Sequence, residues 1–211
     1  IGYDTAVDVA TNALDMLQPT AASHRRAMIL EVMGRDAGHI ALNAGIAGGA
    51  DVILIPEIPY SLNSISKHIE SIRSKGRNHA LIVVAEAVKK ENGSKAYVKF
   101  VDGEVRLGGI GSYLGDKIYK LTNAETRVTV LGHVQRGAQP THRDRLIASA
   151  FGVHAVDLVA KGKFNKIVVW QNRAVTDINL DTIVGSAKTI KVNDPLIKVA
   201  QALGIYVGEL N

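Results

Sequence analysis

Short apolar runs rich in valine and isoleucine alternate along the chain with longer stretches in which apolar residues recur every three or four positions. The runs predict buried β-strands and the longer stretches predict amphipathic helices. This alternation indicates an α/β fold, a three-layer sandwich in which a mostly parallel sheet is flanked by helices. An alternating stretch across residues 95–107, around Asp102-Gly103, predicts a hairpin insertion beside that sheet. The predicted strands span residues 28–32, 52–55, 80–85, 128–131 and 167–170, and the predicted helices span residues 5–17, 40–47, 61–75, 110–121, 144–159 and 195–203.

Candidate capping residues stand where two of these helices begin. Asp4 or Thr5 is placed to cap the first helix, and Thr141 or His142 to cap the long helix that starts near residue 144. A cap accepts a hydrogen bond from a backbone N–H group that the first helical turn leaves unpaired.

The composition is that of a globular chain. Of the 211 residues, 46% are hydrophobic and 21% are charged, so the chain can bury a core. No apolar run approaches the ~18 residues that span a bilayer, and the first residues lack the layout of a signal peptide. Cysteine is absent, which excludes disulfides, cysteine nucleophiles and thiolate metal sites and fits a reducing cytoplasm. We therefore expect a cytoplasmic protein without a membrane partner.

The charge points to an anionic ligand. The net charge is +5 and the sequence pI is about 9.4. Nucleic acid is the generic candidate, but only 5% of residues are aromatic and no Lys/Arg-rich block occurs. The arginines stand singly, beside glycines and strand ends, which suits small phosphates better. We expect no nucleic acid partner.

Polar residues follow three of the predicted parallel strands. Met33-Gly34-Arg35 comes after the first strand, Glu86 after the third, and a loop with His133 and Arg136 after the fourth. Ligands of open parallel sheets bind beyond the carboxyl ends of the strands. Guanidiniums, an imidazole and a carboxylate together suit a phosphorylated polyol. The alternative is that the arginines bond loop carbonyls and Glu86 pairs with one of them, and spacing alone does not decide between the two.

Two more arginines stand at the opposite strand ends. Arg26 and Arg127 begin the strands whose other ends carry Arg35 and Arg136. At ~3.3 Å per residue, Arg26 and Arg35 should lie on the order of 20 to 25 Å apart, too far for one small phosphate. If all of them bind sugar phosphate, Arg26 and Arg127 must serve a neighbouring subunit. The alternative is ordinary solvation of strand ends.

A third basic cluster, Lys75, Arg77 and His79, joins a helix end to a strand start. It could bind phosphate, although cations at a helix carboxyl end are favoured without any ligand. The chain has no GxxxxGK[ST] or GxGxxG motif, and its histidines lack metal-ligand spacing, so we predict no metal site.

Several motifs carry a resemblance to a known family. Their order and spacing are similar to those of the 6-phosphofructokinases, ATP- or pyrophosphate-dependent, and together they cover most of the chain. The motifs are SHRR at 23–26, EVMGR at 31–35, AGIAGGAD at 44–51, IPE at 55–57, RVTVLGHVQRG at 127–137 and DRLIA at 144–148.

The resemblance implies a phosphofructokinase-like fold and a glycolytic enzyme that transfers a phosphoryl group to the 1-hydroxyl of fructose 6-phosphate. It implies that Arg35 is catalytic, stabilising the phosphoryl group in flight. Mg²⁺ would accompany the donor phosphates. The implied contacts to the sugar phosphate are Met33, Gly34, Arg35, Glu86, His133 and Arg136 within a subunit, and Arg26 and Arg127 from a neighbour in a homo-oligomer.

The resemblance also implies an effector-phosphate site between subunits, formed by Asp51, Lys75, Arg77 and His79. Gln18 stands where allosteric bacterial members tend to carry an arginine, which weighs against effector control. GYDTAVDVAT, the RGAQP loop and the long hairpin look more like the pyrophosphate-dependent or mixed-substrate branch. The donor-loop residues that decide are absent from the chain, so ATP and pyrophosphate both stay open.

The family's GGDG-type donor loop and acidic TIDND-type segment, which holds the catalytic base, do not occur in this chain. The resemblance places both upstream of Ile1. It implies a sugar-phosphate domain at residues 1–139, a segment at 140–189 that completes the donor domain, and a helix at 190–211 that returns to the first domain. Residues between the last predicted strand and this helix look polar and irregular.

We therefore expect the 211 residues alone to be inactive, because the base and the donor loop are lacking. Measurable turnover by the purified chain would contradict this expectation. The alternative is a non-catalytic, phosphate-sensing regulatory domain that keeps the sugar site.

Overall fold

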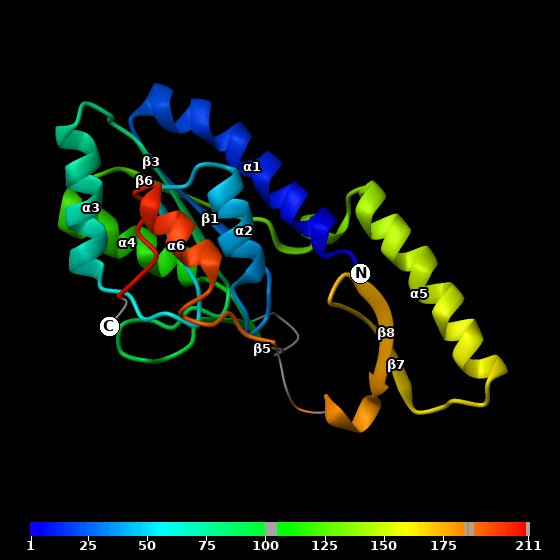
Figure 1. The fold of residues 1–211 in the computed structure, drawn as a ribbon. Helices are drawn as coiled ribbons and strands as arrows, with labels where there is room; N and C mark the ends of the chain where they lie inside the picture. Colours follow the sequence, from blue (N-terminus) through cyan, green and yellow to red (C-terminus); the bar gives the residue numbers. More distant parts are fainter. Residues whose placement is uncertain (100–104, 184, 186–187, 210–211) are drawn as a thin grey trace.

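A four-stranded parallel sheet lies between two layers of helices (Figure 1). The structure is a computed structural model that describes residues 1–99, 105–183, 185 and 188–209. The strand order is β2-β3-β1-β6, and every pairing in this sheet is parallel. The α/β class expected from the sequence is thereby confirmed. The strands are β1 (Ala27–Val32), β2 (Val52–Leu54), β3 (Ala80–Ala85) and β6 (Thr126–Val130).

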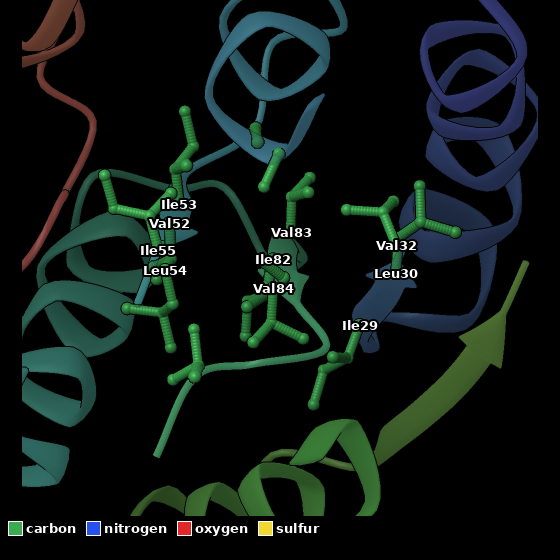
Figure 2. Close-up of a cluster of buried hydrophobic side chains, with 14 of the residues drawn as sticks. Ile29, Leu30, Val32, Val52, Ile53, Leu54, Ile55, Ile82, Val83 and Val84 are labelled. Atoms are coloured by element: carbon green, nitrogen blue, oxygen red, sulfur yellow. The ribbon is translucent and has the colours of Figure 1, made fainter. Parts of the chain in front are cut away.

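The sheet is held mainly by its own apolar side chains. All residues of β1, β2 and β3 are buried, as expected of strands covered by helices on both faces. Figure 2 shows valine, isoleucine and leucine side chains from all three strands side by side in the core, among them Ile29, Ile53 and Ile82. Burying each such side chain contributes about 1.5 to 3 kcal/mol, so this cluster supplies much of the folding free energy.

Helices cover both faces of the sheet. Helices α1, α2 and α6 pack on one face, and α3 and α4 pack together on the other. No helix in the described part of the chain is long and apolar enough to cross a membrane. The helices are α1 (Tyr3–His24), α2 (His39–Ala47), α3 (Leu62–Ser74), α4 (Ile110–Thr122) and α6 (Pro195–Ala202).

A buried carboxylate joins the central strand to α4. Glu31 of β1 is 2% exposed, and its two oxygens accept hydrogen bonds from the backbone N–H groups of Gly109 (2.9 Å) and Gly111 (2.8 Å). Burial raises the pKa of this carboxyl, although both hydrogen bonds favour the charged form. A side chain at Gly111 would come within 3.0 Å of the carboxylate, so the helix start needs glycine there. Glu31, the first residue of the EVMGR motif, is therefore a structural residue.

Helix α5 and a two-stranded hairpin stand beside the sheet (Figure 1). The expected strand at 167–170 is present, but it pairs antiparallel with a second strand that the sequence reading took for an irregular polar segment. Its polar positions are used within the hairpin: Asp177 pairs with Lys166 (3.4 Å) and with His154 of α5 (3.3 Å). The elements are α5 (His142–Ala160), β7 (Lys166–Gln171), β8 (Ala174–Asn179) and the short 3₁₀ helix η2 (Leu180–Thr182).

The chain then returns to the main sheet. The backbone N–H of Ile190 donates to Glu57 (3.0 Å), and the same carboxylate accepts from Gly38 at the start of α2. After α6, the N–H of Ile53 donates to the carbonyl of Tyr206 (2.9 Å), which adds a bridge at the β2 edge. The last described residues are therefore part of the main core.

The expected hairpin insertion is present as β4 (Tyr97–Lys99) and β5 (Val105–Leu107), paired antiparallel. The expected turn at Asp102-Gly103 lies outside the described residues. The other elements agree with the prediction within a residue or two, apart from α1.

Helix α1 corrects two expectations. It runs on through Pro19 to His24 instead of ending at residue 17, and neither Asp4 nor Thr5 caps it. The cap position is Gly2, and the carboxylate of Asp144 in α5 accepts from the backbone N–H groups of Gly2 (2.7 Å) and Thr5 (2.8 Å). A distant side chain thus satisfies the helix start, which local sequence could not reveal. At α5 the expected cap is confirmed, because the Thr141 hydroxyl accepts from the Asp144 N–H (3.3 Å).

The Asp144 junction gives a pH-dependent prediction. Burial raises the pKa of Asp144, but the hydrogen bonds from Thr5 and Gly2 outweigh it and hold the pKa below its ordinary value. A lowered carboxyl pKa contributes stability above the unfolded pKa of about 4 and loses it as the pH falls through the folded pKa. Asp144→Asn should therefore reduce the free energy of unfolding by about 1 to 2 kcal/mol at pH 7.

Denaturant unfolding at pH 7 and at pH 3 measures this effect, with Asp157→Asn on the exposed side of α5 as the control. The difference between the wild type and Asp144→Asn should shrink at pH 3. An equal difference at both pH values would contradict the role assigned to the ionised carboxylate.

Candidate functional site

The carboxyl ends of three neighbouring strands bring the expected polar loops together. Strand β1 lies between β3 and β6, so the residues after these strands share one edge of the sheet. The pairing continues past the strand ends, since the N–H of Glu86 donates to Val32 (2.9 Å) and the N–H of Leu131 donates to Glu31 (3.1 Å). Residues 33–35, Glu86 and the 3₁₀ helix η1 (Gly132–Arg136) therefore surround one region of space.

Glu86 holds the loop after β1. Its Oε1 accepts hydrogen bonds from the backbone N–H groups of Gly34 (3.2 Å) and Arg35 (2.9 Å). Within the described residues these amides, and not an arginine side chain, are the partners that the structure gives Glu86. The ion pair considered as an alternative from the sequence is therefore not formed here.

Gln135 ties the third loop to the first. Its side chain is 2% exposed, and its Oε1 accepts from the N–H of Met33 (3.0 Å). A buried amide side chain needs such a partner, and here the bond spans two loops that are far apart in sequence. The sequence reading missed Gln135 because it weighed only charged residues in HVQRG. The signal that could have found it was a polar residue between His133 and Arg136, the two residues of this loop that were expected to contact a ligand.

The loop after β1 has an unusual backbone. A side chain at Gly34 would meet the carbonyl oxygen of Ala37 at 2.6 Å, so only glycine fits. Arg35 has a φ of 54°, a left-handed conformation that costs a non-glycine residue on the order of 1 kcal/mol or more. The hydrogen bonds from this loop to Glu86 and Gln135 offset that cost. The result is an arginine side chain presented at the exposed tip of a fixed loop.

His133 and Arg136 point the same way. In a 3₁₀ helix, residues three positions apart lie on one side, and η1 contains both. Both side chains are exposed, whereas Gln135 between them is buried. The edge thus presents two guanidiniums, an imidazole and a carboxylate to solvent. The buried side chain of Gln135 links two of the loops that carry these groups.

Arg26 and Arg127 lie at the opposite end of the same strands. Arg26 immediately precedes β1, and Arg127 is the second residue of β6, paired in register with Met28. Both guanidiniums contact Glu125, Arg26 at 3.0 Å from its Oε1. The structure therefore does not bring these two arginines to the site formed by Arg35 and Arg136.

The third basic cluster borders a separate hollow of about 930 Å³ between α3 and the residues that follow α6. Its lining includes Asp51, Lys75 and Arg77 together with His68, but not His79. Asp51 is 8% exposed, forms an ion pair with Arg77 and accepts from the N–H of Leu81 (2.8 Å). Burial lowers the pKa of His68, although Asp51 favours its charged form. The charge of Arg77, one of the cations expected to bind an effector phosphate, is therefore already neutralised by Asp51.

No group of three or more His, Cys, Asp or Glu side chains within the described residues is placed to hold a metal ion.

The fold and the site define an α/β protein that presents two guanidiniums, an imidazole and a carboxylate where the strands of a parallel sheet end. The chain belongs to the phosphofructokinase family, because the family profile described as "Phosphofructokinase" matches residues 1–159. This agrees with the resemblance seen in its motifs.

Curated relatives carry the same name. The chain is 55% identical over 209 residues to "ATP-dependent 6-phosphofructokinase 1" of Nostoc sp., and 52% identical over 208 residues to the protein of that name in Synechocystis sp.. Each match covers 99% of this chain and 58% of the relative. The chain thus spans little more than half the length of these relatives.

Solved structures agree on the fold. Phosphofructokinase from Saccharomyces cerevisiae matches with a TM-score of 0.72 and 31% identity, over 95% of this chain and 25% of that chain. A pyrophosphate-dependent phosphofructokinase from Nitrosospira multiformis matches with a TM-score of 0.75 over 97% of this chain and 55% of that chain. At 20% identity the second match shows the fold alone.

Proposed function

We propose that this chain forms the acceptor-binding part of a 6-phosphofructokinase, which phosphorylates the 1-hydroxyl of fructose 6-phosphate. The observation that carries the proposal is the convergence of Arg35, Glu86, His133 and Arg136 at one sheet edge, on loops joined by Glu86 and Gln135. The proposal concerns a polypeptide of the relatives' length, since the chain spans 58% of them. Their printed names favour ATP over pyrophosphate as the donor.

The chemistry of each group fits a sugar phosphate. Arg136 offers a planar fork of N–H donors that matches phosphate oxygens. His133 lies on the same side of η1 and can hydrogen-bond a sugar hydroxyl. Glu86 uses Oε1 for the loop amides, which leaves Oε2 as the acceptor for a second hydroxyl. Met33 and Gly34 would complete the contact with the sugar phosphate, since both lie in the loop that the hydrogen bonds to Glu86 fix.

Arg35 is the catalytic residue that we propose in this chain. Phosphoryl transfer is promoted by positioning and by fixed positive charge near the transferred group. The left-handed backbone at Arg35 and its N–H bond to Glu86 support this role, because they fix the loop whose tip carries the exposed guanidinium. ATP would supply the phosphoryl group with Mg²⁺ on its phosphates, both bound mainly outside the residues of this chain.

We propose that the sugar site is completed by a second copy of the chain. Arg26 and Arg127 lie at the far end of β1 and β6, so one subunit cannot place them on the phosphate that its own Arg136 binds. A homo-oligomer that juxtaposes opposite strand ends would bring four guanidiniums to each ligand. Arg26 and Arg127 are then substrate-binding residues for the neighbour.

We propose that residues 1–139 and 190–211 form the sugar-phosphate domain and that residues 140–189 belong to a donor-binding domain. Return of the chain to the main sheet through Ile190 and Tyr206 supports this division. Apolar side chains of the α5 and β7–β8 module are left exposed and would pack against the rest of such a domain. Those at least 60% exposed are Leu146, Val153, Val156, Val159 and Phe164.

We propose only weak effector binding at the third basic cluster. Asp51 already pairs with Arg77, and His79 does not line the hollow. Lys75 and His68 remain as groups that face a phosphate there. Gln18, an uncharged residue, adds no further cation from α1.

Arg136 provides the direct test in a full-length protein that contains this chain. Arg136→Ala should raise the KM for fructose 6-phosphate about 10- to 100-fold, because a charge-assisted hydrogen bond contributes about 1.5 to 3 kcal/mol. The KM for ATP should change by less than about twofold, because the donor binds elsewhere. Steady-state kinetics with each substrate varied in turn measures both.

The control is Arg136→Lys, which keeps the positive charge but loses the planar fork of N–H donors. Its KM for fructose 6-phosphate should fall between those of the wild type and Arg136→Ala. An equal rise in the KM for fructose 6-phosphate and the KM for ATP would count against the assignment of Arg136 to the sugar-phosphate site. Binding of fructose 6-phosphate without any turnover by the full-length wild type would instead favour the phosphate-sensing alternative.

A further inference from the structure

A single carboxylate holds the two arginines at the amino ends of β1 and β6. Glu125 immediately precedes β6, and its carbonyl accepts from the N–H of Ala27, which fixes its backbone beside β1. Its side-chain Oε1 contacts the guanidiniums of both Arg26 and Arg127. Two cations from neighbouring strands thus converge on one oxygen atom.

The contact folds Arg127 back onto its own chain. One terminal nitrogen of Arg127 pairs with Glu125, and the other donates to the carbonyl of Thr126 at 2.9 Å. One contact on each terminal nitrogen is therefore made within the chain, which turns the guanidinium towards Glu125 and Thr126. Arg127 would have to leave these partners for both terminal nitrogens to face a phosphate presented by another molecule.

Arg26 depends on the same carboxylate. Its Nε is buried and has no hydrogen-bond partner within the described residues, so its contact with Glu125 at 3.0 Å is the ion pair that holds its guanidinium. The hydrogen bond from Arg26 is also the chief cause of the lowered pKa of Glu125, with the charge of Arg127 adding to it. Glu125 is therefore ionised at neutral pH and cannot release the arginines by protonation.

We propose that Glu125 is an intrachain latch, a carboxylate that occupies the arginine pair until the phosphate of a sugar phosphate bound by a second copy displaces it. The inference rests on the proposed function for its ligand. Two guanidiniums and one carboxylate leave the cluster with a single positive charge, whereas a phosphate monoester carries close to two negative charges at pH 7. Phosphate and Glu125 repel one another, so the two compete for the same pair of cations.

The latch predicts a gain of affinity from a loss of charge. Glu125→Gln keeps the shape of the side chain but removes its negative charge, so the dissociation constant for fructose 6-phosphate should fall about three- to ten-fold. A gain of this kind cannot arise from misfolding, which makes the direction of the change informative. The matched control is Asp116→Asn, the same loss of charge at an exposed position on α4, which should leave the constant within about a factor of 1.5.

Isothermal titration of the full-length oligomer, with fructose 6-phosphate and with inorganic phosphate as separate ligands, carries the test. The Glu125→Gln change is repeated in a background of Arg26→Ala and Arg127→Ala, where the latch has nothing to hold and the gain should disappear. Weaker or unchanged binding by Glu125→Gln would overturn the latch, as would a gain that persists without the arginines.

The two ligands separate the two proposals. The protein could bind inorganic phosphate, more tightly with Glu125→Gln and without that gain when both arginines are removed, and yet fail to bind fructose 6-phosphate. This result would support the latch and contradict the proposed function. Binding of fructose 6-phosphate with no effect of Glu125→Gln would do the reverse. Failure of both ligands to bind would contradict both.

Discussion

The position of β1 is the constraint on which the rest of the molecule depends. It pairs in parallel with β3 on one side and β6 on the other, so three strands end at one edge and begin at the other. One edge therefore gathers the loops that carry Arg35, Glu86 and Arg136, and the opposite edge gathers Arg26 and Arg127. Because β1 and β3 are fully buried and β6 is paired in register with β1, neither set can move towards the other. The separation of the cations is a property of the sheet.

Strand periodicity and the rule that ligands bind at carboxyl ends were enough to predict the sheet and which charged residues would lie together at the candidate site. They depend on local patterns, which a sequence displays directly. Gln135, Asp144 and Glu125 were not predicted, because each acts on groups far away in the sequence or on a neighbouring strand. The second strand of the β7–β8 hairpin was missed for a related reason. Its polar positions look like a loop until their partners are known.

The contrast between local patterns and contacts across the sequence also describes how the candidate site is held together. Polar contacts between loops hold the exposed side chains of the candidate site in place. Gln135 fixes the loop after β1 from beneath, Glu86 bonds its amides, and Glu31 fixes the start of α4 behind it. Glu125 differs, because it pairs with two cations that we propose act in the site of a neighbouring copy. The proposed enzyme would then need a second copy both to complete its pocket and to release the arginines that complete it.

The central claim is that each site combines the carboxyl edge of one copy with the amino edge of another. The most direct measurement mixes two full-length variants, Arg136→Ala and the double variant Arg26→Ala with Arg127→Ala, each nearly inactive at low fructose 6-phosphate. In mixed oligomers some sites would join an intact Arg136 to an intact Arg26 and Arg127. The account predicts that co-expression or reassembly restores activity well above that of either variant. Activity that stays at the average of the two parents would contradict it.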